Sequence, residues 1–215
     1  QILQRAVAND PLDVVNHGYL ADLLWKMGEK AAALDRIELA VKLGPGYSWG
    51  WDVMHDWATE LQCVERCEAA ARELVRLRPN ECRSWQVLFR VLRGAEHFAE
   101  RLAAIERAIE LNSRNEEAHD WKAWLLAENQ RIDEALAACR PAPWGEQPPV
   151  MLQMRAAQVC AGHGQTDRAI ELYRKIVTED PVNADAWQGL ADAYDASGRK
   201  PEYLDAAEHL QKLRP

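Results

Sequence analysis

The sequence predicts an all-α protein built from repeated pairs of helices, and three observations lead to that fold class. Prolines recur at multiples of 34 residues, at Pro11, Pro45, Pro79, Pro181 and Pro215. Apolar residues recur three and four positions apart in most segments, which is the spacing of one face of an α-helix. No segment alternates apolar and polar residues for long enough to form a β-strand.

The 34-residue period divides the chain into repeat units without an insertion. We expect a single domain over residues 1–215, in which residues 1–13 are the end of a truncated preceding repeat. The predicted units are 14–47, 48–81, 82–115, 116–149, 150–183 and 184–215.

The first helix of each unit is expected to span about 12–14 residues. In the first unit its apolar face is marked by Leu20, Leu23 and Leu24. Glycine ends such helices because it readily adopts the left-handed conformation. It stands at the expected ends in three units, at Gly28, Gly164 and Gly198.

The second helix of each unit carries a similar apolar pattern and then meets a proline. The fifth unit shows the pattern most fully, at Ala169, Ile170, Tyr173, Ile176, Val177 and then Pro181. In the fourth unit, 116–149, the second helix is predicted to be interrupted, because Arg140 is followed by PAPWGEQPP. Prolines so close together stop a helix, so we expect an extended loop in place of its last turns.

The residues at fixed positions of the units carry a family resemblance. The last unit has Trp187, Leu190, Ala191, Tyr194, Gly198, Ala207 and Pro215. This pattern resembles the tetratricopeptide repeat (TPR) family, and the resemblance covers nearly the whole chain. It implies a right-handed superhelical α-solenoid of stacked helix-turn-helix repeats, with a concave groove lined by the first helices.

Composition excludes several classes of function. The net charge of -8 argues against nucleic acid as a partner, and no apolar run is long enough to cross a membrane. Five cysteines without a Cys-x-x-Cys pair indicate reduced thiols, hence a cytoplasmic location and no metal site. We predict no enzyme, catalytic residue or cofactor, because neither a nucleophile motif nor a phosphate loop is present. Since the chain begins at Gln1 without Met, we expect a fragment of a longer protein.

The chain has nine tryptophans, and their helical positions divide them. Trp51, Trp85 and Trp187 occupy the family's tryptophan position and are expected to pack, as are Trp57 and Trp121. Trp144, in the proline-rich loop, either fills the gap left by the missing helix turns, which we favour, or projects towards a partner. The remaining three lie on the predicted groove side, at Trp25, Trp49 and Trp124.

The same helical phase places charged and polar residues on the groove side: Asp52, Asp56, Arg83, Gln86, Arg90, Arg93 and Asp120. Two interpretations remain open. In the first, the arginines pair with Asp52, Asp56, Glu117 and Asp120 of adjacent first helices and only hold the stack together. In the second, they bind carboxylates of a peptide whose apolar residues pack on the groove tryptophans.

The predicted function is a non-catalytic protein–protein interaction domain that binds an extended peptide or a partner helix in its concave groove. The partner is therefore a protein or peptide. An alternative is a sensor or substrate-recruitment segment of a larger multidomain enzyme or signalling protein. A third is a scaffold that self-associates through uncapped ends.

Overall fold

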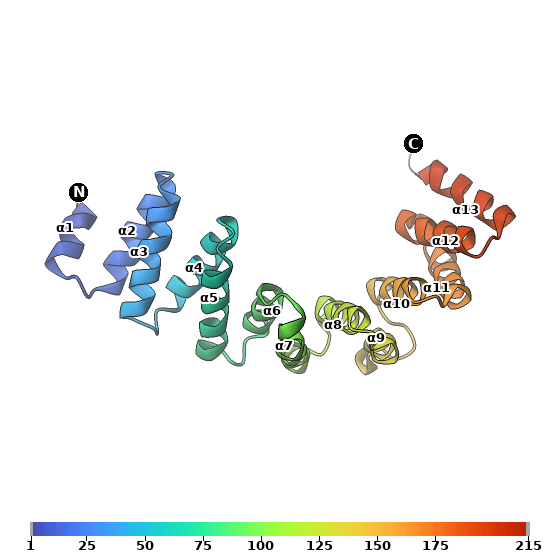
Figure 1. Ribbon diagram of the computed structural model, residues 1–215, viewed down its shortest axis with the longest axis horizontal. Coiled ribbons are helices and arrows are strands. Elements are labelled where there is room, and N and C mark those ends of the chain that lie inside the picture. The colour runs from blue at the N-terminus through green and yellow to red at the C-terminus, as the bar shows by residue number, and fades with distance from the viewer. Residues whose placement is uncertain (1, 214–215) are drawn as a thin grey trace. The chain divides into compact units, whose positions relative to one another are not determined.

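The computed structural model describes residues 2–213, which form helices joined by short connections, with no strand among them. The helices group into two compact units, one ending at Leu111 and the other beginning at Asn112 (Figure 1). Within each unit consecutive helices pack as pairs, so the predicted all-α fold of stacked helix pairs is confirmed. No helix in residues 2–213 has both the length and the apolar character needed to span a bilayer.

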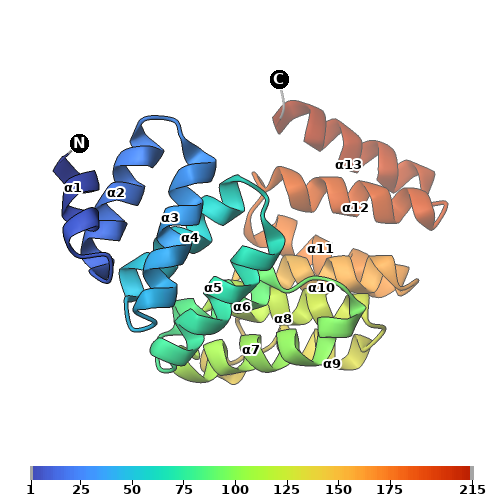
Figure 2. The same ribbon diagram turned by 60° about the vertical axis from the view of Figure 1, so that its left-hand side comes forward.

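The first unit contains three helix pairs after a short leading helix. In chain order its helices are α1 (Ile2–Asn9), α2 (Val14–Lys26), α3 (Lys30–Leu43), α4 (Ser48–Glu60), α5 (Val64–Leu77), α6 (Cys82–Val91), the 3₁₀ turn η1 (Ala95–His97) and α7 (Phe98–Leu111). The two helices of each pair lie side by side, as α2 and α3 show in Figure 2.

The second unit has the same pairing. Its helices are α8 (Glu116–Glu128), α9 (Ile132–Ala138), the 3₁₀ turn η2 (Ala142–Trp144), α10 (Val150–Gly162), α11 (Thr166–Glu179), α12 (Ala184–Ala196) and α13 (Lys200–Leu213). The first helices of all pairs begin 34 residues apart, at Val14, Ser48, Cys82, Glu116, Val150 and Ala184. The bounds of the repeats and their grouping in one domain stay predictions.

The fourth residue of every first helix ties that helix to the connection before it. Its side chain donates a hydrogen bond to a backbone carbonyl five or six residues earlier. The pairs are His17–Pro11, Trp51–Pro45, Trp85–Pro79, His119–Ser113, Gln153–Pro148 and Trp187–Pro181, at 2.8–3.1 Å. These contacts give Trp51, Trp85 and Trp187 the structural role that their position predicted.

The turn between the two helices of each pair contains a residue with positive φ, in the left-handed backbone conformation. Gly28 has φ +85°, and Gln62, 34 residues later, adopts φ +58°. This conformation suits glycine but brings the Cβ of other residues close to the following carbonyl oxygen. Gln62 therefore stores backbone strain that Gly28 does not.

We expect Gln62→Gly to stabilise the protein by roughly 0.5–1 kcal/mol, because it removes that strain. Urea denaturation followed by circular dichroism measures the change. Glu29→Gly is the matched control, since Glu29 lies in a similar turn at φ -81° and gains nothing from glycine. An unchanged or lower stability for Gln62→Gly would show that the turn is unstrained.

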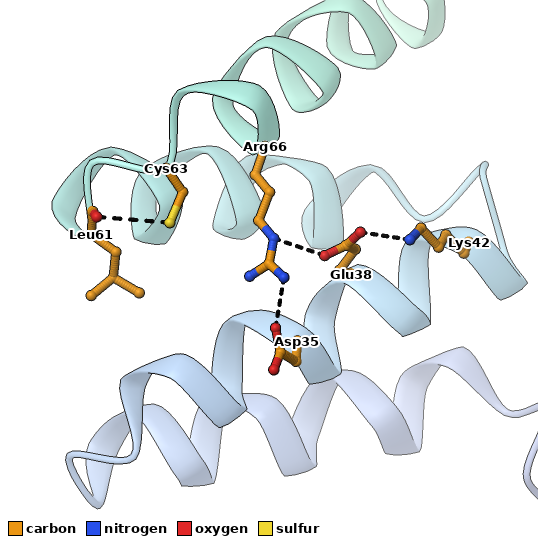
Figure 3. A network of polar contacts seen from close by, with 6 residues as sticks. All are labelled: Asp35, Glu38, Lys42, Leu61, Cys63 and Arg66. Atoms are coloured by element: carbon orange, nitrogen blue, oxygen red, sulfur yellow. Dashed lines mark hydrogen bonds and ion pairs between the residues drawn. The ribbon is translucent and has the colours of Figure 1, made fainter.

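Ion pairs connect successive second helices in the first unit. Arg66 of α5 reaches Asp35 and Glu38 of α3, at 2.7 and 2.9 Å, while Lys42 pairs with the same Glu38 (Figure 3). Arg72 of α5 pairs with Glu100 of α7 in the same way. These pairs are partly exposed and each adds at most about 1 kcal/mol. They link each second helix to the next one along the first unit.

The fourth pair departs from the others, because α9 has only seven residues and ends at Ala138. The loop that follows carries Trp144, whose ring packs edge-on against His119 with centroids 5.5 Å apart. Arg114 donates to the carbonyl of Pro143 at 3.0 Å and holds the loop down. Trp144 thus fills space beside α8, as the favoured prediction has it.

Candidate functional site

The predicted groove residues fall in both units, and each unit presents its own candidate surface. Asp120 and Trp124 belong to the second unit. The other eight lie in the first, at Trp25, Trp49, Asp52, Asp56, Arg83, Gln86, Arg90 and Arg93. Their assembly into a single groove stays a prediction.

In the first unit Trp49 lies over a glycine of the preceding first helix. A Cβ atom added to Gly18 of α2 would stand 2.4 Å from Tyr47 Oη and 3.1 Å from Trp49 Cζ3. The rings of Tyr47 and Trp49 are 5.6 Å apart and tilted by 47°. Glycine at position 18 therefore makes room for two aromatic side chains, one of which, Trp49, stays 42% exposed.

Two further apolar side chains extend this patch. Tyr19 is 61% exposed and Val15 is 43% exposed, one turn apart on α2. Tyr19 directly follows Gly18, over which Tyr47 and Trp49 lie. Burial raises the pKa of the Tyr47 hydroxyl, and the charges of Tyr19 and Asp13 raise this pKa further. We call Val15, Tyr19, Tyr47 and Trp49 the aromatic surface. The sequence reasoning missed both tyrosines, although a glycine inside a helix was a signal of close packing.

Trp25 differs from Trp49, although both were predicted to face the groove. The Trp25 ring stacks on the buried Trp57 with centroids 4.5 Å apart and planes within 3°. Lys30 Nζ also lies 5.1 Å from its centroid. Trp25 packs against the core of the first unit and so offers little free surface.

Asp52 and Asp56, the two predicted groove acids of the first unit, contact residues outside α6. Asp52 receives both Nη groups of Arg78, at 3.2 and 2.6 Å, and this hydrogen bonding raises the pKa of Arg78. Asp56 contacts the adjacent His55 at 3.1 Å. The interpretation that Asp52 pairs with arginines of the next first helix is therefore wrong, because the end of α5 supplies Arg78 instead.

Helix α6 presents positive charge without acid. Its sequence, CRSWQVLFRV, contains no Asp or Glu, and Arg83, Arg90 and the following Arg93 are exposed. Within residues 2–213, Arg83 and Arg93 form no ion pair. Gln86, on α6 between Arg83 and Arg90, is half-buried.

In the second unit Asp120 is committed to a structural pair. It is buried, and its two oxygens accept from Arg155 Nε and Nη2 of α10, at 2.7 and 2.8 Å. The hydrogen bond to Asp120 raises the pKa of Arg155. Nearby, burial and then the Asp120 charge raise the pKa of Cys139 to about 12, so this thiol is unreactive. Within its own unit Asp120 thus has Arg155 as its partner, and its predicted pairing with arginines of the preceding first helix stays a prediction.

The second unit has two adjacent hollows on its first helices. One, of about 220 Å³, lies between α8 and α10 and includes Trp124, Arg155 and His163. The other, of about 330 Å³, lies between α10 and α12 and includes Tyr173 and Asp192. Gln158 lines both, so the hollows meet at this residue of α10.

His119 gives the second unit a pH dependence. Burial, and then the charge of Lys122, lower the pKa of His119 from its ordinary value of 6.5, against an opposing hydrogen bond to the Ser113 carbonyl. A lowered pKa means that the unfolded chain binds this proton more readily than the folded one. His119 therefore contributes stability that is complete above pH 6.5 and is lost as the pH falls towards its folded pKa.

We expect His119→Gln to reduce the loss of stability between about pH 7.5 and about pH 5.5, because an amide does not titrate there. Glutamine suits this position, since Gln153 makes the equivalent bond to the Pro148 carbonyl in the next unit. Urea denaturation at the two pH values measures both proteins. An equal acid-induced loss in the variant would show that His119 is not responsible.

Among residues 2–213 no group of three or more His, Cys, Asp or Glu side chains is placed to hold a metal ion. The one strongly perturbed thiol, Cys139, is displaced towards the unreactive form. The surfaces described above offer shape, aromatic rings and charge.

Comparisons with known proteins point in one direction. Two family models, both described as tetratricopeptide repeat, match residues 87–148 and 161–213, together more than half of the chain. Tetratricopeptide repeat-containing protein trd-1 of Caenorhabditis elegans is 28% identical over 155 residues, or 71% of this chain. The chain spans only 19% of the length of that curated relative.

Solved structures share the fold at low sequence identity. The Naa15/Naa10 structure bound to HypK-THB has a TM-score of 0.72 at 15% identity, over 98% of this chain and 33% of that one. A tetratricopeptide repeat protein from Parabacteroides merdae has 0.71 at 11% identity, over 93% and 79%. YrrB, described as having an unusual peptide-binding site, has 0.53 at 17% identity, over 100% and 93%.

Proposed function

The chain belongs to the tetratricopeptide repeat family, whose fold supports protein–protein interaction. We propose that it binds an extended segment of a partner protein on the exposed faces of its first helices. The role is non-catalytic recognition. The segment lies on the aromatic surface of the first unit and uses Trp49 as its main apolar contact.

The exposure of the aromatic surface carries this proposal. Aromatic rings contribute strongly to protein interfaces, where a few buried anchors hold most of the binding energy. Trp49 and Tyr19 stay exposed, whereas Tyr47, whose ring contacts Trp49, packs against the core of the unit. Apolar side chains grouped within a charged surface are typical of interaction sites.

A solved relative adds general support. YrrB shares the fold over the whole of this chain and is described as having a peptide-binding site. The hollows between α8, α10 and α12 offer the second unit a place for peptide side chains as well. The alternative role, as a recruitment segment of a larger protein, uses the same surfaces and stays a prediction.

Selection from a phage-displayed library of random dodecapeptides tests the proposal. We expect selected peptides to bind Trp49→Ala about 30-fold more weakly than the wild type, because truncating an interface anchor costs about 2 kcal/mol or more. Fluorescence polarisation with synthetic peptides measures the affinities. Leu39→Ala, which truncates an exposed apolar residue on the second helix α3, is the matched control and leaves them unchanged.

Equal binding by wild type and Trp49→Ala, with the variant folded, would contradict the proposal. Light scattering across protein concentration tests the third hypothesis alongside. A protein that stays monomeric at all concentrations excludes self-association. If the wild type forms an oligomer and Trp49→Ala is monomeric, the aromatic surface is a self-association site.

A further inference from the structure

We propose that the segment bound by the first unit is acidic, with an apolar anchor on the aromatic surface and a carboxylate about three residues or more away bound by Arg83. This inference rests on the proposed function and names the chemistry of its ligand. Three points carry it: the common position of Trp49 and Arg83, the core that α4 and α6 share, and the absence of an ion pair at Arg83 within residues 2–213.

Trp49 and Arg83 occupy the same position in consecutive first helices. Each is the second residue of its helix, α4 and α6 respectively. The Trp49 ring leans over Gly18 of the preceding first helix, so closely that a Cβ atom at Gly18 would stand only 3.1 Å from Trp49 Cζ3. Since the pairs repeat every 34 residues, Arg83 projects from α6 on the side from which Trp49 projects from α4.

The spacing follows from helix packing. Packed helices lie about 8–10 Å apart. An extended chain advances about 3.3 Å per residue. Both α4 and α6 border one core cluster, so a peptide that crosses from α4 to α6 spans at least one such helix separation, or about three residues or more. An apolar residue at Trp49 and an acidic residue about three positions or more along the peptide match the two side chains.

Charge complementarity selects the acidic residue. Asp52 of α4 holds the repeat position next to Arg83 that Gly18 of α2 holds next to Trp49. Its carboxylate already accepts hydrogen bonds from both Nη groups of Arg78. Arg83 and Arg93 form no ion pair within residues 2–213, and α6 itself contains no acid. A guanidinium group binds a carboxylate through two parallel hydrogen bonds, which a neutral side chain does not match.

The acidic character of the whole chain does not oppose this choice. Its net charge of -8 repels an acidic peptide at long range. At physiological salt, exposed charges are screened beyond about 8 Å, so the arginines nearest to the peptide dominate. The binding should consequently weaken as salt rises further.

Peptides selected on the wild-type protein test the inference when one charge is removed from the peptide and, separately, one from the protein. In a peptide that binds through Trp49, replacing the acidic residue by its amide should weaken binding about tenfold, since a charge-assisted hydrogen bond is lost. Arg83→Gln should weaken binding of the acidic peptide about tenfold and leave the amide peptide unaffected. Arg76→Gln, on the second helix α5 of the same unit, is the matched control and should bind both peptides as the wild type does.

The two proposals fail in different ways. Peptides that need Trp49 but tolerate the amide and Arg83→Gln would overturn the acidic ligand and leave the proposed function standing. Peptides that bind without Trp49 would overturn the proposed function itself. The peptide-side substitution needs no folded variant, so a failure of Arg83→Gln to fold leaves the test decisive.

Discussion

Asp120→Ala should lower the stability of the second unit by about 3 kcal/mol, because it leaves the guanidinium of Arg155 without its partner in a largely buried place. The pair is bidentate, at 2.7 and 2.8 Å, and joins α8 to α10. Only 12% of the Asp120 side chain and 26% of the Arg155 side chain are exposed. Water therefore replaces little of the lost interaction. Urea denaturation followed by circular dichroism measures the change.

Glu134→Ala is the matched control. Glu134 makes the same two-bond contact with Arg131, at 2.7 and 2.6 Å, but on the exposed side of α9. Exposed pairs of this kind contribute at most about 1 kcal/mol. Equal effects of the two substitutions would show that burial of the Asp120–Arg155 pair does not determine its contribution.

Trp25→Ala should destabilise the first unit by about 2 kcal/mol, less than a fully buried tryptophan because part of its ring is exposed. The substitution removes the ring that stacks on Trp57 and covers the core between α2 and α4. A shift of the urea midpoint, at an unchanged slope, measures this loss.

Trp49→Ala provides the comparison for Trp25. Its ring rests on Gly18 and Tyr47 but is 42% exposed, so we expect a loss of stability below about 1 kcal/mol. Peptide binding should show the opposite order, with Trp49→Ala the more damaging. Similar losses of stability for the two variants would remove the distinction between a structural and a binding tryptophan.

These two tryptophans mark how far the sequence could predict the site. The 34-residue period determined where helices begin, and the first helices start at the expected residues from Val14 to Ala184. Helical phase also assigned Trp25 and Trp49 to one face. Helical phase, however, gives only the face of one helix from which a side chain projects. Whether a ring of a neighbouring helix covers that side chain depends on tertiary packing. The stack of Trp25 on Trp57 was therefore not predictable.

The ion pairs show the same limit. Arginine and aspartate at matching positions of adjacent first helices suggested direct pairing. Arg78, at the end of α5, and Arg155, on α10, take Asp52 and Asp120 instead. Arg78 lies 26 residues from Asp52, and Arg155 lies 35 residues from Asp120. Several other arginines lie at similar distances along the sequence from these two aspartates. Composition alone does not select among them, and the choice leaves Arg83 and Arg93 available to a ligand.

The position of a bound peptide tests the central claim most directly. A selected peptide carrying a photoreactive leucine at its apolar position can be crosslinked to the wild-type protein, and the attachment sites read by mass spectrometry. The account predicts crosslinks on α2 and α4, at residues of the aromatic surface such as Tyr19 and Trp49. Crosslinks confined to the second helices α3, α5 and α7 would contradict it.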